Sequence, residues 1–252
     1  MAYKIKFYNR KIAEKREKYF DKNSIFKKNV IDTNRLFFDY ILKAIDKLSC
    51  KNKNHIKILD LGTGTGYVPR ILTQLSKNKF KIVGIDLVPE MLNMARSKTS
   101  DSRIKYLLGD NKNLPFQSGS FDIVTNKLST QFDLIEVKRV LKNGGFFIFK
   151  EYGKYKGFKE IAERFKNRYK KSKTDIVDYI KILQNLNFRE IILHTLFLKR
   201  KYNFQEIKNI FEMTNLINNF NLKDLNLIKI KIFKKNKQID IHSDPFIIFA
   251  QK

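Results

Sequence analysis

The chain has 252 residues, of which 42% are hydrophobic and 13% aromatic, a composition typical of a globular protein and not of a disordered one. Its formal net charge of +27 indicates an anionic partner such as nucleic acid, an acidic protein or a membrane surface. However, 41 lysines stand against 11 arginines in a chain also rich in Asn and Ile, so codons rich in A and T explain the charge equally well.

The single cysteine, Cys50, excludes an internal disulfide and any site with several cysteine ligands. No apolar run is long enough to span a bilayer, and the N-terminal residues lack the apolar segment of a secretory signal. We therefore expect a cytoplasmic protein with no metal centre and no membrane partner.

Residues 1–55 are polar, basic and mostly helical in pattern, which predicts a helical N-terminal extension or lid. From residue 56 onward, short apolar runs alternate with helical periods, as in a parallel sheet wound with helices. We expect one domain over residues 56–252, with insertions at about 153–175 and 199–244. Helices are expected after the first, second and fourth strands, over 175–187 and over about 204–220. The expected strands are 56–61, 81–87, 103–108, 121–125, 146–152, 190–198 and 246–250.

The most informative segment is residues 58–66, which read Ile-Leu-Asp-Leu-Gly-Thr-Gly-Thr-Gly. Its glycines, Gly62, Gly64 and Gly66, lie where the first strand turns into a helix. Such a turn lets the backbone approach a ligand closely and presents helix N–H groups to it. A glycine turn alone is a weak signal, because many tight loops share it.

Acidic residues at the ends of three consecutive strands strengthen this signal. Asp60 ends the first strand, Asp86 the second, and Asp110 follows the third, with Asn111 beside it. Ligands of open α/β sheets bind at the carboxyl ends of the strands, so we expect these side chains to face one cleft. A carboxylate at Asp86 can accept hydrogen bonds from both hydroxyls of a ribose, and one at Asp110 can accept a hydrogen bond from an adenine amino group.

This pattern resembles the class I S-adenosylmethionine (SAM)-dependent methyltransferases, in particular their type 11 group. The resemblance covers residues 56–152 and rests on the segments 59–66, 83–92, 109–110, 114–116 with 120–124, and 141–145. It implies a Rossmann-like α/β fold, with a seven-stranded, mostly parallel sheet, helices on both faces and an antiparallel last strand. It also implies SAM as the cofactor and S-adenosylhomocysteine (SAH) as its product.

The resemblance assigns roles to individual residues. Gly62, Gly64 and Gly66 would lie under the methionine and ribose of SAM, and Asp60 would help to hold the methionine part. Asp86 would bind the ribose and Asp110 the adenine amino group, while Asn111 or Leu87 would border the ring. Thr63, Met91 and Asn126 complete the predicted cofactor contacts.

A nicotinamide dinucleotide is the rival ligand for a glycine-rich turn of this kind. Its fingerprint is G-x-G-x-x-G, whereas this chain has G-x-G-x-G preceded by Asp60. An acid beside a pyrophosphate would repel it. SAM has no phosphate and carries an amino group and a sulfonium, so the sequence favours SAM.

No catalytic residue is identified. Relatives often have histidines after the fourth strand, but residues 126–132 read Asn-Lys-Leu-Ser-Thr-Gln-Phe. His194 lies in an apolar strand pattern typical of a core histidine, and His242 lies in a polar segment near the last strand. A base could also come from Tyr19, Tyr152 or an acid in the insertions, or the acceptor could need none.

The insertions are expected to determine which substrate is bound. Segment 150–173 has ten basic residues against three acidic ones, and Phe158, Ala162, Phe165 and Tyr169 share one helical face. This pattern fits a cap helix with solvated lysines, or a lid that docks RNA or an acidic acyl carrier protein.

Three functions follow from these observations. The first is methylation of a small metabolite or natural-product intermediate, the second is methylation of RNA, and the third is SAM binding without catalysis. Two classes of nucleic-acid methyltransferase are disfavoured. Enzymes that methylate the exocyclic amines of adenine or cytosine usually have an Asn/Asp-Pro-Pro-aromatic motif after the fourth strand, which residues 126–129 lack. Enzymes that methylate cytosine C5 need a cysteine near the cleft, whereas Cys50 lies upstream of the first strand. The sequence does not indicate the oligomeric state.

Overall fold

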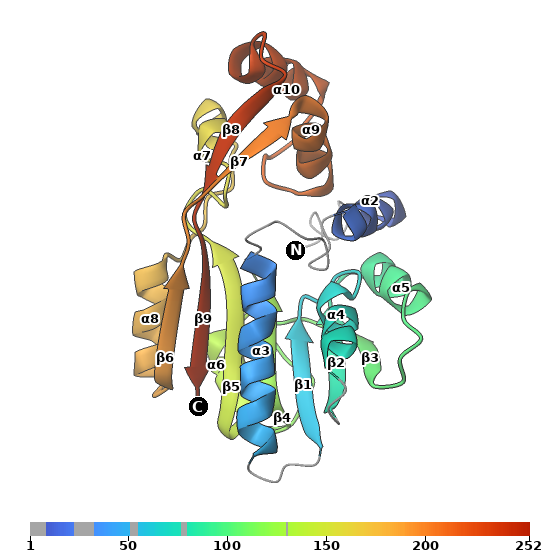
Figure 1. Ribbon diagram of the computed structural model, residues 1–252, viewed down its shortest axis with the longest axis vertical. Coiled ribbons are helices and arrows are strands. Elements are labelled where there is room, and N and C mark those ends of the chain that lie inside the picture. Colours follow the sequence, from blue (N-terminus) through green and yellow to red (C-terminus); the bar gives the residue numbers. More distant parts are fainter. Residues whose placement is uncertain (1–8, 23–32, 51–54, 77–79, 130) are drawn as a thin grey trace.

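The computed structural model describes residues 9–22, 33–50, 55–76, 80–129 and 131–252, with only the backbone for residues 19–22. Seven strands form one sheet in the order β3-β2-β1-β4-β5-β9-β6 (Figure 1). They are β1 (Ile56–Leu61), β2 (Phe80–Asp86), β3 (Ile104–Leu108), β4 (Phe121–Lys127), β5 (Leu141–Tyr152), β6 (Arg189–Thr195) and β9 (Pro245–Gln251). Strand β9 is antiparallel to β5 and β6, and the other neighbours are parallel. The predicted Rossmann-like α/β fold with an antiparallel last strand is confirmed.

Helices cover both faces of this sheet. On one face lie α3 (Thr33–Ser49) and α4 (Tyr67–Leu75), whose apolar side chains pack on Ile58, Ile148 and Phe249 of the strands. On the other lie α6 (Leu134–Val140) and α8 (Ile176–Asn185), which pack on Phe147 and Phe149. Helix α5 (Pro89–Ser97) packs on β3. Because the central strands are covered twice, their residues are apolar on both sides, which is why the sequence shows them as continuous apolar runs.

A second layer, here called the cap, consists of residues 153–175 and 198–243 and stands above the carboxyl ends of the strands (Figure 1). Strands β7 (Leu198–Asn203) and β8 (Gln238–Ser243) pair antiparallel. Around them lie α7 (Lys159–Ala162), a 3-10 turn over Glu163–Phe165, α9 (Phe204–Met213), α10 (Leu222–Leu227) and a π-helical stretch over Ile228–Phe233.

One arginine joins the two parts of the cap. Both terminal nitrogens of the Arg168 guanidinium lie 2.8 Å from the Asp224 carboxylate oxygens, and the same group donates to the carbonyls of Asn218 and Asn219. Residues 153–175 and 198–243 therefore pack as one unit.

Helix α2 (Arg10–Lys22) lies between the sheet domain and the cap (Figure 1). Ile12 and Ala13 are buried in the apolar cluster of the cap, which also includes Met91 of α5 and Phe211 of α9. The two described helices within residues 1–55 thus differ in place, because α3 packs on the sheet and α2 bridges to the cap.

Four predicted elements have other bounds in the structure, and strand β8 and helix α10 were not predicted. Strand β5 begins at Leu141, five residues earlier than predicted, and the predicted strand 190–198 ends at Thr195, with Leu198 starting β7. The predicted helix 204–220 ends at Met213, and segment 153–175 holds two short helical turns instead of one amphipathic helix. The face predicted for that helix is still largely buried, because Ala162, Phe165 and Tyr169 all enter the cap cluster.

Within the described residues, no helix is long and apolar enough to cross a bilayer. The same residues contain no group of three or more His, Cys, Asp or Glu side chains that could hold a metal ion.

Candidate active site

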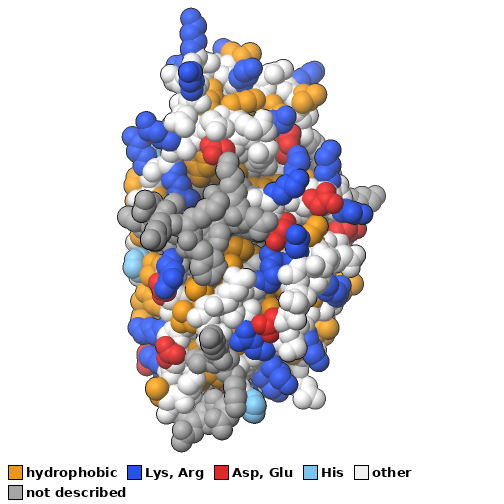
Figure 2. All heavy atoms as spheres, turned by 45° about the vertical axis from the view of Figure 1, so that its right-hand side comes forward, with side chains coloured by type: hydrophobic (Ala, Val, Ile, Leu, Met, Phe, Trp, Pro, Cys, Tyr) orange, Lys and Arg blue, Asp and Glu red, His pale blue; other side chains and the backbone are white. Residues whose placement is uncertain are grey.

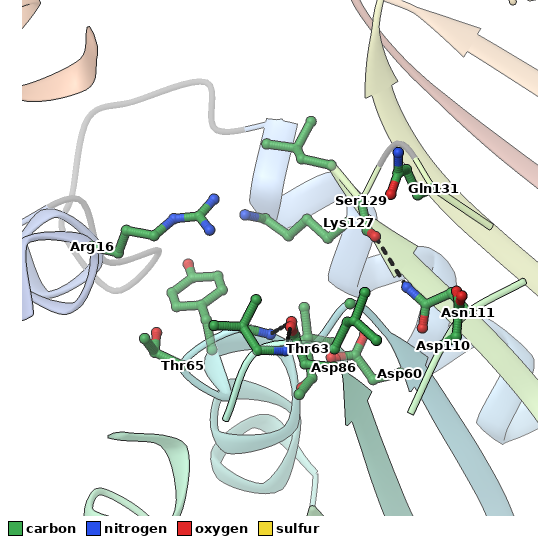
Figure 3. Close-up of a pocket in the computed structure, with 17 residues that line it drawn as sticks. Arg16, Asp60, Thr63, Thr65, Asp86, Asp110, Asn111, Lys127, Ser129 and Gln131 are labelled. Atoms are coloured by element: carbon green, nitrogen blue, oxygen red, sulfur yellow. Dashed lines mark hydrogen bonds between the residues drawn. The ribbon is translucent and has the colours of Figure 1, made fainter. Parts of the chain in front are cut away.

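A cavity opens at the carboxyl ends of β1, β2 and β4, beneath α2 (Figure 3). Eight of the eleven predicted cofactor residues line it: Asp60, Gly62, Thr63, Gly64, Asp86, Leu87, Asp110 and Asn111. Gly66, Met91 and Asn126 do not. The lining also contains residues that the sequence did not single out: Arg16, Thr65, Tyr67, Val68, Val88, Lys127, Leu128, Ser129 and Gln131.

Two glycines of the turn after β1 have different tasks. Gly64 has a φ of +56°, and a Cβ there would meet no atom within 4 Å, so its backbone faces open space in the cavity. Gly66 has a φ of +78° and starts α4, and a Cβ there would lie 2.2 Å from the Tyr106 hydroxyl. Gly64 therefore allows a ligand to approach, whereas Gly66 allows the helix to pack against β3.

Asp86 fixes the shape of this turn. Its Oδ2 accepts a hydrogen bond from the Gly64 amide at 2.8 Å, and its Oδ1 accepts one from the Val88 amide at 3.0 Å. Burial raises the pKa of the carboxyl, while these amide hydrogen bonds and Arg16 act in the opposite direction. The side chain links the end of β2 to the glycine turn and lines the cavity between them.

Asp60 is the most deeply buried acid of the site, with a relative exposure of 1%. Its Oδ1 accepts a hydrogen bond from the Thr125 hydroxyl at 2.8 Å, whereas Oδ2 has no hydrogen-bond partner among the described residues. Burial raises the pKa of this carboxyl to about 7, against the opposing effects of Thr63, Thr125 and Lys127. A buried acceptor of this kind favours a cationic donor in the cavity.

Asp110 and Asn111 form the far wall of the cavity, with Ser129 facing them (Figure 3). Asp110 accepts from the amide of Lys112 at 2.9 Å. The Asn111 amide nitrogen donates to the Ser129 hydroxyl at 3.2 Å, and its buried Oδ1 has no partner among the described residues. This wall thus offers a further buried acceptor to a ligand.

The three predicted residues outside the lining support the site from behind. Gly66 packs against β3, as described above. The Asn126 side chain exchanges hydrogen bonds with the backbone of Ser129 at 3.0 and 3.1 Å and so shapes the loop after β4. Met91 is buried in the cap cluster beneath α2.

Neither histidine considered as a base lines the cavity. His194 lies in β6, with its Nδ1 3.5 Å from the Tyr40 hydroxyl. His242 lies in β8, where Nδ1 is 2.7 Å from Glu160 Oε1 and the ring stacks on Phe197, beside a separate cavity of the cap. Of the tyrosines, Tyr152 is not among the lining residues, and the Tyr19 side chain lies outside the described part of the chain.

Comparison with known proteins gives the family of this domain. Residues 59–149 match the family model described as a methyltransferase domain. The YcgJ protein of Bacillus subtilis has the same fold, with a TM-score of 0.55 and 16% identity over 83% of this chain and 98% of that one. Residues 59–149 are a class I SAM-dependent methyltransferase domain.

Relatives of this methyltransferase domain include enzymes with different acceptors. A ubiquinone/menaquinone biosynthesis C-methyltransferase of Citrifermentans bemidjiense is 36% identical in an alignment of length 106, which covers 38% of this chain and 45% of that protein. A malonyl-[acyl-carrier protein] O-methyltransferase of Nitrosospira multiformis is 26% identical in an alignment of length 183, which covers 63% of this chain and 55% of that protein. The chain spans about half the length of the curated relatives it matches.

The methyltransferase site fits SAM, the cofactor of this family. The buried Asp60 Oδ2 can accept a hydrogen bond from the α-ammonium group of SAM, and the open space at the Gly64 backbone leaves room for the cofactor. The wall of Asp110 and Asn111 offers acceptors for the amino group of adenine. A carboxylate next to the glycine turn would repel a pyrophosphate, so the same geometry disfavours a dinucleotide.

Proposed function

We propose that the chain is an enzyme that transfers a methyl group from SAM to a small-molecule metabolite or natural-product intermediate. The observation that carries the proposal is the buried Asp60, which lines the cavity together with the glycine turn and Asp86 and has one carboxylate oxygen without a hydrogen-bond partner among the described residues. The bound cofactor supplies an activated methyl group on its sulfonium.

The chain's own residues would orient the two reactants. Asp86 would accept hydrogen bonds from the ribose hydroxyls, Asp60 from the ammonium group, and the wall of Asp110 and Asn111 from the adenine amino group. Helix α2 and the cap would restrict access of water to the cavity. Positioning of this kind supplies much of the acceleration in a displacement with a good leaving group, and it needs no general base when the acceptor is already nucleophilic.

An acyl group on an acidic carrier protein is the second candidate acceptor. Two observations favour it: the malonyl-[acyl-carrier protein] O-methyltransferase matches a longer part of this chain than the methyltransferase domain alone, and segment 150–173 is strongly basic. RNA has less support, because Lys and Arg are spread over the face seen in Figure 2 with acidic side chains between them, instead of forming one stripe. A cytoplasmic location stays a prediction.

Transfer of labelled methyl from SAM tests these candidates. The purified protein is incubated with labelled SAM and with an extract separated into small molecules, protein and RNA, and in parallel with malonyl-[acyl-carrier protein] and free malonate. Label in small molecules supports the first proposal, and label in malonyl-[acyl-carrier protein] but not in malonate supports the second. SAM binding without label in any fraction would contradict both and favour a non-catalytic protein.

A further inference from the structure

The end of the cap that lies farthest from the sheet is one continuous segment, residues 222–237, here called the tip. It consists of α10, the π-helical stretch and the turn that leads into β8 (Figure 1). Three aliphatic side chains of the tip reach solvent, since Leu222 is 75% exposed, Ile230 64% and Leu227 38%. Single exposed aliphatic residues are common on protein surfaces, but three in one protruding segment indicate a contact surface.

The inward side of the tip is packed, so these exposed residues are not part of an unfilled core. Ile228 and Phe233 belong to the apolar cluster of the cap, and Leu225 is also buried. The Asp224 carboxylate pairs with Arg168, which joins α10 to the rest of the cap. The tip therefore has a fixed inward side and a fixed outward side.

The outward side of the tip is strongly basic. Its one acidic residue, Asp224, is buried and paired with Arg168, so it offers no counter-charge at the surface. All six lysines of the tip are exposed: Lys223, Lys229, Lys231, Lys234, Lys235 and Lys237. Figure 2 shows hydrophobic and basic side chains side by side at the top of the molecule, where the cap lies. The tip thus combines exposed aliphatic groups with a clear excess of positive charge.

This combination favours a membrane surface over a protein or an RNA as the partner. Protein interfaces are anchored chiefly by Trp, Tyr and Arg, and single-stranded RNA stacks on aromatic rings and arginine. Residues 222–237 contain no arginine, and their one aromatic residue, Phe233, is buried. Aliphatic side chains interleaved with lysines are instead typical of segments that lie on an anionic bilayer, where the lysines face lipid phosphates and the apolar groups leave water.

We propose that the tip docks the chain on the surface of an anionic membrane, with its exposed aliphatic side chains inserted between lipid headgroups and its lysines against the phosphates. The sequence predicts no membrane partner because no apolar run can span a bilayer, but docking on a surface needs no such run. No residue of the tip lines the cofactor cavity, so this inference goes beyond the proposed methyl transfer and does not depend on it.

Co-sedimentation of the full chain with sucrose-loaded vesicles tests the proposal. One set of vesicles contains only phosphatidylcholine, and the other contains equal parts of phosphatidylcholine and phosphatidylglycerol. Binding is measured at about 0.05 M and about 0.3 M salt. Two variants alter the tip: Ile230→Gln removes an exposed aliphatic side chain, and the double substitution Lys234→Gln/Lys235→Gln removes two charges.

Each tip variant has a matched control in the sheet domain. Ile135 of α6 is 64% exposed, the same fraction as Ile230, so Ile135→Gln removes an equally exposed aliphatic side chain elsewhere. Lys81 and Lys105 are exposed near the first residues of β2 and β3, at the end of the sheet opposite the cap. Lys81→Gln/Lys105→Gln therefore lowers the net charge as much as the double tip variant does.

We expect the unaltered chain to bind the anionic vesicles at least about tenfold more tightly than the neutral ones, and more weakly at the higher salt concentration. Ile230→Gln should weaken binding to anionic vesicles about tenfold, because an aliphatic side chain no longer leaves water. The double tip variant should weaken it about 25-fold, at about fivefold for each charge near the lipid surface. Both controls should bind within about twofold of the unaltered chain, and all four variants should keep its midpoint of thermal unfolding.

Four results would overturn the proposal. Absence of binding to anionic vesicles at low salt would exclude the membrane as a partner. Equal losses in the tip variants and their controls would show that the net charge of the whole chain attracts the vesicles. A loss in the lysine variant without any loss in Ile230→Gln would show adsorption without insertion. Binding of acyl carrier protein or single-stranded RNA that the tip substitutions abolish, while vesicle binding persists, would assign the tip to that partner.

Discussion

Substitution Asp60→Asn tests the reasoning about the site most directly, because Asp60 is fully buried in the free protein. Burial raises its pKa from the usual 3.8 to about 7. Between these two pH values the unfolded chain has lost the proton while the folded protein keeps it, so the stability contributed by this group falls as pH rises through the window. At about 1.4 kcal/mol per pH unit, the loss amounts to about 4 kcal/mol near pH 7 and stays constant above it.

The variant should not show this loss. An asparagine has nearly the same shape, can accept the hydrogen bond from the Thr125 hydroxyl and does not ionise in this range. In the absence of cofactor, we expect the free energy of unfolding of Asp60→Asn, relative to the unaltered chain, to increase by a few kcal/mol between pH 4 and pH 7. Other buried acids titrate in both proteins and largely cancel in the difference.

Urea unfolding at a series of pH values measures this difference, with and without SAH. With SAH bound, an ammonium group beside Asp60 would favour the ionised carboxylate, so the unaltered chain should gain more stability from SAH than the variant. SAH affinity of the unaltered chain should rise with pH up to about 7. A stability difference that is independent of pH would refute the conclusion that burial raises the pKa of Asp60.

Further predictions concern the glycine turn and the cap. Asp86→Ala should weaken SAH binding about 100-fold or more in calorimetry, because it removes a charged acceptor and also the contact that orders the Gly64 amide. Gly66→Ala should lower the unfolding free energy by about 2 kcal/mol or more, because of the positive φ and the clash with Tyr106. Gly64→Ala should lower it by only about 1 kcal/mol, because the new Cβ meets no protein atom. It should weaken SAH binding, because that Cβ occupies space left open in the cavity. Arg168→Ala should lower the midpoint of thermal unfolding without changing SAH affinity, because Arg168 joins the parts of the cap and does not line the cavity; a loss of SAH binding there would show that the cap controls the cofactor site.

The fold of the first four strands and most of the cofactor cavity could be predicted from sequence because their signals are local. Asp60, Gly62 and Gly64 lie within one turn, and Asp86 and Asp110 end the next two strands, so the topology of a parallel sheet brings them together without further information. Some missed lining residues, such as Thr65 and Lys127, are neighbours of predicted ones in the chain. Arg16 has no such signal, because it belongs to a helix far away in the chain and only the tertiary packing of α2 brings it to the cavity.

Glycines misled the prediction of β5. The predicted strand begins at Phe146, after Gly144 and Gly145, but the preceding helix ends at Val140 and both glycines lie inside the strand. A Cβ on Gly145 would lie 2.8 Å from the carbonyl oxygen of Asp122, so this glycine permits the close approach of β5 to β4. The Lys142 ammonium lies 2.9 Å from the Asp122 carboxylate at the same place, which a sequence pattern cannot show.

The strands of the cap were missed for a different reason. Strand β7 reads Leu-Lys-Arg-Lys-Tyr-Asn. It pairs with β8, and its last residue, Asn203, lies opposite Gln238, which is 35 positions later in the chain. Strand β7 has little apolar alternation. Strand β8 alternates polar residues with Ile239 and Ile241, but its pairing with β7 depends on the intervening helices folding back. The cap cluster supplies that constraint, since Ile241 of β8 packs with Ile207 of α9.

The net charge of +27 therefore has two components with different physical consequences. Most of the described lysines are exposed or half-buried. Salt at about 0.15 M screens their fields beyond about 8 Å, so an acidic partner held by them would be released as salt increases. Arg16 and Lys127 lie in a cavity beside buried carboxylates, where the effective dielectric constant is lower and screening is weaker. Codon bias can account for the first component, because a solvated lysine is compatible with most surfaces. It does not bear on the second, because Arg16 acts on the Asp86 carboxylate and Lys127 on that of Asp60, and each cation lowers the pKa of the carboxyl it faces.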